Sequence, residues 1–442
     1  MKWKNQSFGK GLWLLYISVL AIVLFIFFFR ATSGEYVTEA SDGQIIHMSN
    51  QYKAGKFYDR KEKDVSEEEM FSELIGLDIA SNKNSKMYIA GVTPWVFGLE
   101  DNRFDLESLM NPFEERVGGN ALLSYDIDLM KYIDCAVSGR GYEDVTIVVS
   151  NWKTGEILAT YGNVYEKRFH PGSTIKPILA AAVLTINPEL VNYTYECKSS
   201  THTFATEDGE FTVACAGGNY HGTMNMESAI VKSCNGYFIG LVQQVPKEEL
   251  TKVMEQWGFD SVLSFEQFFY WDHSFLDKSE KSIDYLMAAI GQGNAYMTPF
   301  GLNLCTNAIV SGTGSIQEPR RVLAKTFVPS DTEWKNIVIE NKYEFCNEDV
   351  AVSIRDMMLK VTLNGTGRSF HMEGLAAKTG TAQNERSNTI WTTGGLVNED
   401  TPYSITVCVD GVSQKTSSSE AGKIAKEILT YMTGGDWNEN KG

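Results

Sequence analysis

Ser173 and Lys176 have the side-chain types and the spacing needed for covalent chemistry. The segment Ser173-Thr174-Ile175-Lys176 follows a Pro-Gly pair and opens an apolar run that is typical of a helix. Side chains three residues apart on a helix share a face. A serine hydroxyl needs a neighbouring base to become a nucleophile, and a lysine is a base only when its pKa is lowered by burial or by a nearby cation. We therefore expect Ser173 to attack a substrate and Lys176 to accept its proton.

A second segment, Ser233-Cys234-Asn235, carries a hydroxyl and an amide. We expect Ser233 to relay a proton between Lys176 and a leaving amine. The Asn235 side chain has both a donor and an acceptor, which suits it to binding a peptide bond of the substrate.

A third segment, Lys378-Thr379-Gly380-Thr381, reads as part of a strand at the edge of the site. Lys378 supplies positive potential, and the hydroxyls of Thr379 and Thr381 can bind a substrate carboxylate. Gly380 lacks a side chain that would block a substrate lying along the strand. The backbone N–H groups of Ser173 and Thr381 are the expected donors of an oxyanion hole.

Each segment alone is a weak signal, as a second Lys-Thr-Gly triplet at Lys153–Gly155 illustrates. That triplet lies between two β-rich runs, so we interpret it as a hairpin turn without catalytic function. The combination of the three segments in this order is what indicates an acyl-serine enzyme.

The elements that must position these residues are strands near both ends of the region and helices between them. An antiparallel sheet covered by helices, an α/β (α+β) fold, is the predicted architecture. Asp126 is the expected cap of one helix, and the apolar periodicity of residues 421–432 predicts the last one. The predicted sheet strands are residues 145–150, 157–161, 374–382, 390–397 and 403–409.

Residues 11–29 contain no charge over 19 positions. A helix of that length spans roughly 29 Å, close to the apolar thickness of a bilayer of about 30 Å. Three lysines and no acid precede the run, which places the N-terminus in the cytoplasm and the rest outside. The alternative, a cleaved signal peptide, is disfavoured by the length of the run and by the lack of an A-x-A-like site after it.

The domain prediction follows from these features. It comprises a cytoplasmic tail (1–10), a transmembrane helix (11–29), a short extracytoplasmic pedestal region (30–116), the catalytic domain (117–433) and a disordered tail (434–442). The protein is thus expected in the cell membrane as a single-pass protein whose catalytic domain is extracytoplasmic.

Charge and cysteine content restrict the remaining function classes. The net charge of −17 argues against a nucleic acid partner. No CxxC pair, HExxH motif or histidine cluster indicates a metal, so neither a metal nor a cofactor is expected. Seven cysteines are present; Cys197 and Cys215 flank a polar loop and could pair, or all could be reduced. His170 and His221, near the motifs, are interpreted as structural.

Residues 117 to about 432 resemble the transpeptidase domain of penicillin-binding proteins, and most closely its class B, monofunctional group. Beyond the three motifs, the resemblance rests on these segments: His170–Pro177, His221-Gly222, Glu227–Ala229, Ser233–Phe238, Ile290–Asn294 with Thr298-Pro299, and Ala377–Gln383. It implies a transpeptidase/β-lactamase-like fold. Three departures stand out: His170 where an acid is common, Met130 where glutamine is frequent, and a short region before the domain. That region has no room for a class A glycosyltransferase.

The resemblance also implies a reaction and partners. Ser173 would attack the D-Ala-D-Ala bond of a peptidoglycan stem peptide, release D-alanine and pass the acyl group to an amine of a neighbouring stem. β-Lactam antibiotics would acylate the same serine. A polytopic glycan polymerase is a possible partner in the membrane.

Three alternatives remain open. A D,D-carboxypeptidase would use the same residues with water as the acceptor. A β-lactamase or β-lactam sensor is disfavoured because class D enzymes and sensors have valine at the position of Asn235. The surroundings of Glu266 do not resemble the deacylating loop of class A enzymes either. A non-catalytic scaffold is disfavoured because every catalytic residue is present.

Overall fold

The computed structural model describes most of the chain from residue 119 onward and short stretches before it. The described residues are 52–53, 55–66, 116–117, 119–207, 209–215, 218–260, 262–264, 269–271, 282–328, 330–383 and 386–434. Two compact units divide the chain. One comprises Met1–Tyr58, Asp64–Leu122 and Ala324–Lys335, and the other Asp59–Lys63, Leu123–Leu323 and Asn336–Gly442.

The predicted membrane segment at residues 11–29 lies outside the described residues, as do the tail 1–10, most of 30–116, Glu266 and residues 435–442. Among the helices that the structure does describe, none has both the length and the apolar composition needed to cross a bilayer.

The smaller unit contains most of a four-stranded sheet in the order β15-β14-β4-β2. The strands are β2 (Phe57–Tyr58), β4 (Ala121–Leu123), β14 (Val322–Lys325) and β15 (Lys335–Asn336). Two further short strands, β1 (Tyr52–Lys53) and β3 (Arg116–Val117), pair in parallel. Asn120 connects two other segments of this unit by hydrogen bonds. Its side chain accepts from Lys56 N at 2.9 Å, and its backbone N–H donates to Thr326 Oγ1 at 2.8 Å.

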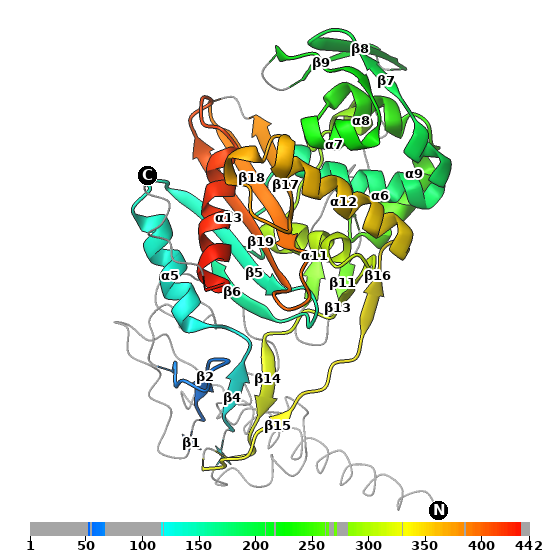
Figure 1. Ribbon diagram of the computed structural model, residues 1–442. Helices are drawn as coiled ribbons and strands as arrows, with labels where there is room; N and C mark the ends of the chain where they lie inside the picture. The colour runs from blue at the N-terminus through cyan, green and yellow to red at the C-terminus, as the bar shows by residue number, and fades with distance from the viewer. Residues whose placement is uncertain are drawn as a thin grey trace, which may run out of the picture. The chain divides into compact units, whose positions relative to one another are not determined.

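The larger unit is built on a five-stranded antiparallel sheet in the order β17-β18-β19-β5-β6 (Figure 1). Its strands are β5 (Asp144–Asn151), β6 (Ile157–Tyr161), β17 (Leu375–Gln383), β18 (Asn388–Leu396) and β19 (Tyr403–Val412). These are the five strands predicted from β-rich runs, within one to three residues at each end. β17, which carries the third motif, is an edge strand.

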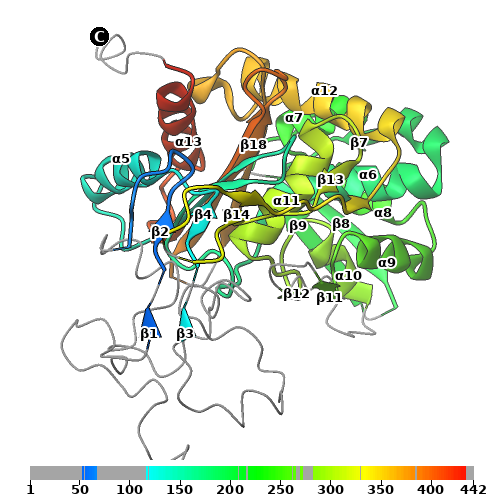
Figure 2. The same ribbon diagram turned by 90° about the horizontal axis from the view of Figure 1, so that it is seen from below.

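Helices cover both faces of this sheet, as Figures 1 and 2 show. Helices α5 (Ile127–Ser138) and α13 (Ser419–Met432) pack on one face, and α11 (Pro299–Val310) packs on the other. Asp126 caps α5 as predicted, because its carboxylate accepts from the N–H groups of Asp128 and Leu129. Every residue of β18 is buried, as expected for a strand covered on both sides.

The remaining helices gather beside α11 in the larger unit (Figure 2). They are α6 (Lys176–Ile186), α7 (Met226–Lys232), α8 (Asn235–Val242), α9 (Lys247–Gln256), α10 (Ser282–Ala288) and α12 (Glu348–Asn364). The short 3-10 helices are η1 (Gly172–Ile175), η2 (Pro188–Asn192) and η4 (Arg368–Phe370).

Short strand pairs accompany these helices. They are β7 (Tyr195–Cys197) with β10 (Gly222–Met224), β8 (Thr201–Thr206) with β9 (Gly209–Ala214), β11 (Val262–Ser264) with β12 (Phe269–Trp271), and β13 (Ser315–Gln317) with β16 (Lys342–Glu344). The pair β11–β12 lies between α9 and α10 in the sequence.

Candidate active site

Ser173 lies in η1, a single tight turn that leads directly into α6. Pro177 stands in the first turn of α6, where its missing N–H has no intrahelical partner to lose. The helix continues as a buried apolar run from Pro177 to Leu184, whereas Ser173 is partly exposed. The nucleophile is therefore held at the accessible end of a helix that is anchored in the core.

Three glycines let the turn that carries Ser173 touch two other backbones. A Cβ on Gly172 would lie 2.6 Å from the carbonyl oxygen of Thr381, and one on Gly291 would lie 2.1 Å from that of Gly172. One on Gly380 would lie 2.7 Å from the Pro171 oxygen. Real Cβ atoms essentially never approach closer than 3.0 Å. The turn that carries Ser173 therefore occupies the space beside Gly380. From the sequence we expected this space to remain open for a substrate.

Lys176 is fully buried and is held by the second motif. Its Nζ donates to the Ser233 carbonyl at 2.8 Å and to Asn235 Oδ1 at 2.7 Å, and lies 3.4 Å from Ser233 Oγ. Burial lowers the pKa of Lys176 to about 8, although Cys234 and Cys215 act in the opposite direction. The pKa of Lys176 therefore lies closer to neutral pH than that of an exposed lysine, which is the direction that a role as a base requires.

Lys378 is the second fully buried lysine of the site. Its Nζ donates to Ser233 Oγ at 3.0 Å and to the carbonyl of Thr379 at 2.9 Å. Burial, and then the nearby Lys176, hold the pKa of Lys378 well below its ordinary value. The Ser233 hydroxyl thus lies between the amines of two lysines.

Ser233 occupies a backbone conformation that is uncommon for serine. It ends α7 with φ 59° and ψ 41°, in the left-handed region. This geometry turns the chain between α7 and α8 and directs both the carbonyl and the hydroxyl of Ser233 toward Lys176. Strain of this kind, of order 1–3 kcal/mol, is found most often at functional sites.

Asn235 begins α8 and is tied to the protein at both ends of its amide. Its Oδ1 accepts from Lys176, and its Nδ2 donates to the Ala214 carbonyl at 2.8 Å. A substrate would meet the second N–H of this amide, since an amide nitrogen carries two donors.

Thr379 and Thr381 differ in their surroundings on β17. Thr379 is buried and its hydroxyl lies 2.7 Å from that of Thr366, whereas Thr381 is partly exposed. Thr366 was not anticipated from the sequence, because its position after α12 carries no motif.

The structure thus joins Lys176, Ser233, Asn235 and Lys378 in one hydrogen-bonded network. Ser173 and Thr381 belong to backbones in direct contact, at η1 and β17. In the described part of the chain, no hydrogen bond joins Ser173 to Lys176. The second triplet stands apart from this network: Lys153 is exposed and pairs with Glu399 at 2.7 Å, in the turn between β5 and β6.

The cysteines and histidines near the motifs form their own contacts. All seven cysteines lie in described residues and are free thiols, so Cys197 and Cys215 are not bridged. His170 donates from Nδ1 to the Ala295 carbonyl at 3.0 Å and stacks on Tyr296, which fits the structural role expected of it. Four groups that could hold a metal ion lie together beside the second motif: Cys197, Cys215, His221 and Cys234.

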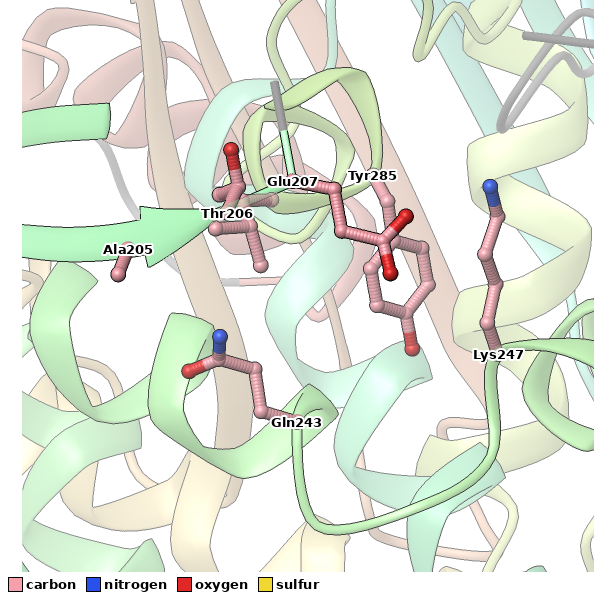
Figure 3. Close-up of a pocket in the computed structure, with 7 residues that line it drawn as sticks. Ala205, Thr206, Glu207, Gln243, Lys247 and Tyr285 are labelled. Atoms are coloured by element: carbon pink, nitrogen blue, oxygen red, sulfur yellow. The ribbon is translucent and has the colours of Figure 1, made fainter. Parts of the chain in front are cut away.

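A cavity of about 490 Å³ lies elsewhere in the larger unit (Figure 3). Figure 3 shows the Glu207 carboxylate and the Tyr285 ring at this cavity, with Gln243 and Lys247 also on its wall. No residue of the three motifs lines it, so it is separate from the network around Ser233.

The chain is similar to known proteins in sequence. The family described as "Penicillin binding protein transpeptidase domain" matches residues 145–430. The peptidoglycan D,D-transpeptidase MrdA of Acinetobacter baumannii is 29% identical over 243 residues, which cover 50% of this chain and 34% of MrdA. The stage V sporulation protein D of Bacillus subtilis is 28% identical over 221 residues, 49% of this chain and 33% of that protein. The matched stretches therefore span about a third of each relative.

Solved structures share the fold. A ceftriaxone acyl-enzyme complex of penicillin-binding protein A from Mycobacterium tuberculosis has a TM-score of 0.70 at 18% identity, covering 86% of this chain and 98% of that one. A D,D-transpeptidase domain from Eggerthella lenta has a TM-score of 0.64 at 18% identity, covering 87% and 99%.

Proposed function

Because the chain belongs to the penicillin-binding protein transpeptidase family, we propose that it is a serine-type peptidoglycan D,D-transpeptidase that also binds β-lactams covalently. The observation that carries the proposal is the convergence of two buried lysines on the Ser233 hydroxyl, with Lys176 three residues after Ser173. Such a network provides a neutral amine, a proton relay and a nearby cation in one place.

In the first half-reaction, the Ser173 hydroxyl attacks the carbonyl of the penultimate D-alanine of a stem peptide. Its proton passes to neutral Lys176, and the oxyanion accepts hydrogen bonds from the backbone N–H groups of Ser173 and Thr381. Ser233 then transfers a proton to the leaving nitrogen, and D-alanine departs. The substrate carboxylate lies near Lys378, Thr379 and Thr381, and Asn235 binds its peptide bond.

In the second half-reaction, an amine of a neighbouring stem attacks the carbonyl carbon of the acyl-serine ester. The proton of the amine passes to neutral Lys176 and from there to Ser173 Oγ as the ester bond breaks. The amide formed is the cross-link. A β-lactam follows only the first half, since its leaving nitrogen remains attached to the acyl group. The similarity to MrdA, a peptidoglycan D,D-transpeptidase, and to penicillin-binding protein A, whose structures include acyl-enzyme complexes, supports this proposal.

The proposed setting is the outer face of the cell membrane. In this proposal residues 11–29 anchor the chain, residues 117–433 form the catalytic domain outside, and a polytopic glycan polymerase is a partner in the membrane. The support is the uncharged run with lysines only before it.

Labelling with a fluorescent penicillin tests the proposal. The full chain should form a stable adduct that is absent in Ser173→Ala. An adduct that disappears within seconds would indicate a β-lactamase, and no adduct from folded protein would indicate a scaffold. Incubation with a D-Ala-D-Ala stem peptide and an acceptor amine, followed by mass spectrometry, separates cross-linking from the simple hydrolysis of a carboxypeptidase.

A further inference from the structure

Three thiols and one imidazole lie close together at the second motif, and one of the thiols, Cys234, belongs to that motif. The ligand atoms of Cys197, Cys215, His221 and Cys234 all lie within 4.8 Å of one another. Cys197 comes from the end of β7, Cys215 follows β9, His221 precedes β10, and Cys234 stands just before α8. The four residues are spread over the sequence without a CxxC or HxxxH spacing, which is why no metal was expected from the sequence.

Two distances within this group match those of a tetrahedral metal centre, and all ligand atoms lie within 4.8 Å of one another. With metal–sulfur bonds near 2.3 Å, two sulfurs of a tetrahedron lie about 3.8 Å apart, and a sulfur and a nitrogen about 3.5 Å apart. The sulfurs of Cys215 and Cys234 are 3.8 Å apart, and Cys197 Sγ is 3.4 Å from His221 Nδ1. The side chains therefore need little movement to surround one ion.

The three thiols of the group are buried, and His221 is partly exposed at its edge. Cys197 and Cys234 are fully buried, and Cys215 is 2% exposed. His202 lies beside the group, with its Nε2 at 3.4 Å from Cys197 Sγ and 3.6 Å from Cys215 Sγ. The other ring nitrogen of His202 is bonded to the Tyr195 hydroxyl at 3.0 Å, which fixes the ring. An outer group that can donate to thiolates is a regular feature of structural thiolate sites.

We propose that Cys197, Cys215, His221 and Cys234 bind one zinc ion in a closed Cys₃His site. Three thiolates and one imidazole in a tetrahedron, without space for water or substrate, are typical of structural zinc and not of catalytic zinc. On binding, each thiol gives its proton to solvent, so affinity increases with pH.

The ion would position the catalytic segment. Cys234 stands between Ser233 and Asn235, both of which hold Lys176. Asn235 also donates to the carbonyl of Ala214, the neighbour of Cys215. A zinc ion would thus join the backbone of the second motif to β7, to the end of β9 and to the turn before β10. The four proposed zinc ligands would affect the reaction by positioning Ser233 and Asn235, and they would not contact the substrate.

The metal content of the purified full chain tests this proposal. We expect about one zinc ion per chain by elemental analysis after dialysis of reduced, untagged protein. Cys197→Ser and His221→Ala should lower this content by about tenfold, because a structural site loses its affinity with its ligands. Cys135→Ser, which changes an exposed thiol on α5, is the matched control and should keep both the zinc and the penicillin adduct.

Two further measurements decide the matter if the variants fail to fold. Wild-type chain reconstituted with Co²⁺ should show the strong thiolate-to-cobalt absorption of a tetrahedral site; an octahedral spectrum, or none, overturns the proposal. Mass spectrometry of unreduced protein should find free thiols, and a disulfide between Cys215 and Cys234 would overturn it as well. Ser173→Ala should retain full zinc content, so failure of the proposed enzymatic function leaves this result unaffected.

Discussion

At the scale of single residues, the site depends on Lys176 and Lys378 sharing the Ser233 hydroxyl. Each amine is fully buried, and among the residues that the structure describes neither donates a hydrogen bond to a carboxylate. The interior therefore favours loss of a proton from this pair, since two buried like charges destabilise each other.

The acylation rate should rise with pH. Lys176 must be neutral to accept the Ser173 proton, and its pKa is lowered to about 8 by burial. Below that pH the rate constant for penicillin should increase about tenfold per pH unit, and above it a plateau is expected. The titratable groups facing Lys176 are Lys378, Cys215 and Cys234. Stopped-flow acylation between pH 6 and 10 measures this profile, and a rate independent of pH would contradict the role of Lys176.

Removing the Ser233 hydroxyl should slow acylation by about 10²–10⁴-fold, the usual contribution of a positioned acid–base group. Two variants separate this effect from backbone strain. Both Ser233→Ala and Ser233→Gly lack the hydroxyl, but glycine accepts the left-handed φ of 59°. We expect equal losses of rate, with Ser233→Gly more stable than Ser233→Ala by about 1 kcal/mol. Recovery of the rate in the glycine variant would show that the hydroxyl is dispensable.

At the scale of elements, the contact between η1 and β17 sets the position of Ser173 relative to Thr381. Gly380→Ala should force this contact apart, because the added Cβ would lie 2.7 Å from Pro171 O and 2.8 Å from Thr174 Cγ2. We expect a loss of about 1–3 kcal/mol in the free energy of unfolding, together with slower acylation.

Gly139→Ala is the control for this change. Gly139 has φ −78° and no atom within 4 Å of the added Cβ, so the variant should behave as wild type. Chemical denaturation and penicillin labelling of the two variants give the comparison. If Gly380→Ala and Gly139→Ala had equal stability and equal labelling, the close contact between η1 and β17 would not be needed for folding or acylation.

The sequence predicted those elements whose signals are local. The runs of β-rich residues in β17, β18 and β19, the apolar stripe of α13 and the Asp126 cap each lie within a few residues. β11 and β12 were missed because both are three residues long. Thr366 could not be predicted, because only the tertiary fold brings it to β17. The cluster of Cys197, Cys215, His221 and Cys234 could not be predicted either, because only the tertiary fold brings these four residues together beside α8.

At the scale of the whole molecule, the expected membrane anchor determines where the reaction occurs. The full chain should sediment with membranes, and a chain in which residues 11–29 are replaced by a polar linker should not. Protease added to intact spheroplasts should degrade residues after 30 and spare an epitope placed before residue 10. Protection of the catalytic domain from the protease would reverse the predicted orientation.

The contact among Gly172, Gly291 and Gly380 also restricts how this gene can vary. Every single-base missense change in a glycine codon introduces at least a Cβ, and at these three positions that atom would collide with a neighbouring backbone. Under the proposed function, inherited changes in β-lactam affinity should therefore arise at other positions, such as the partly exposed Thr381. Isolates selected on β-lactams should retain all three glycine codons.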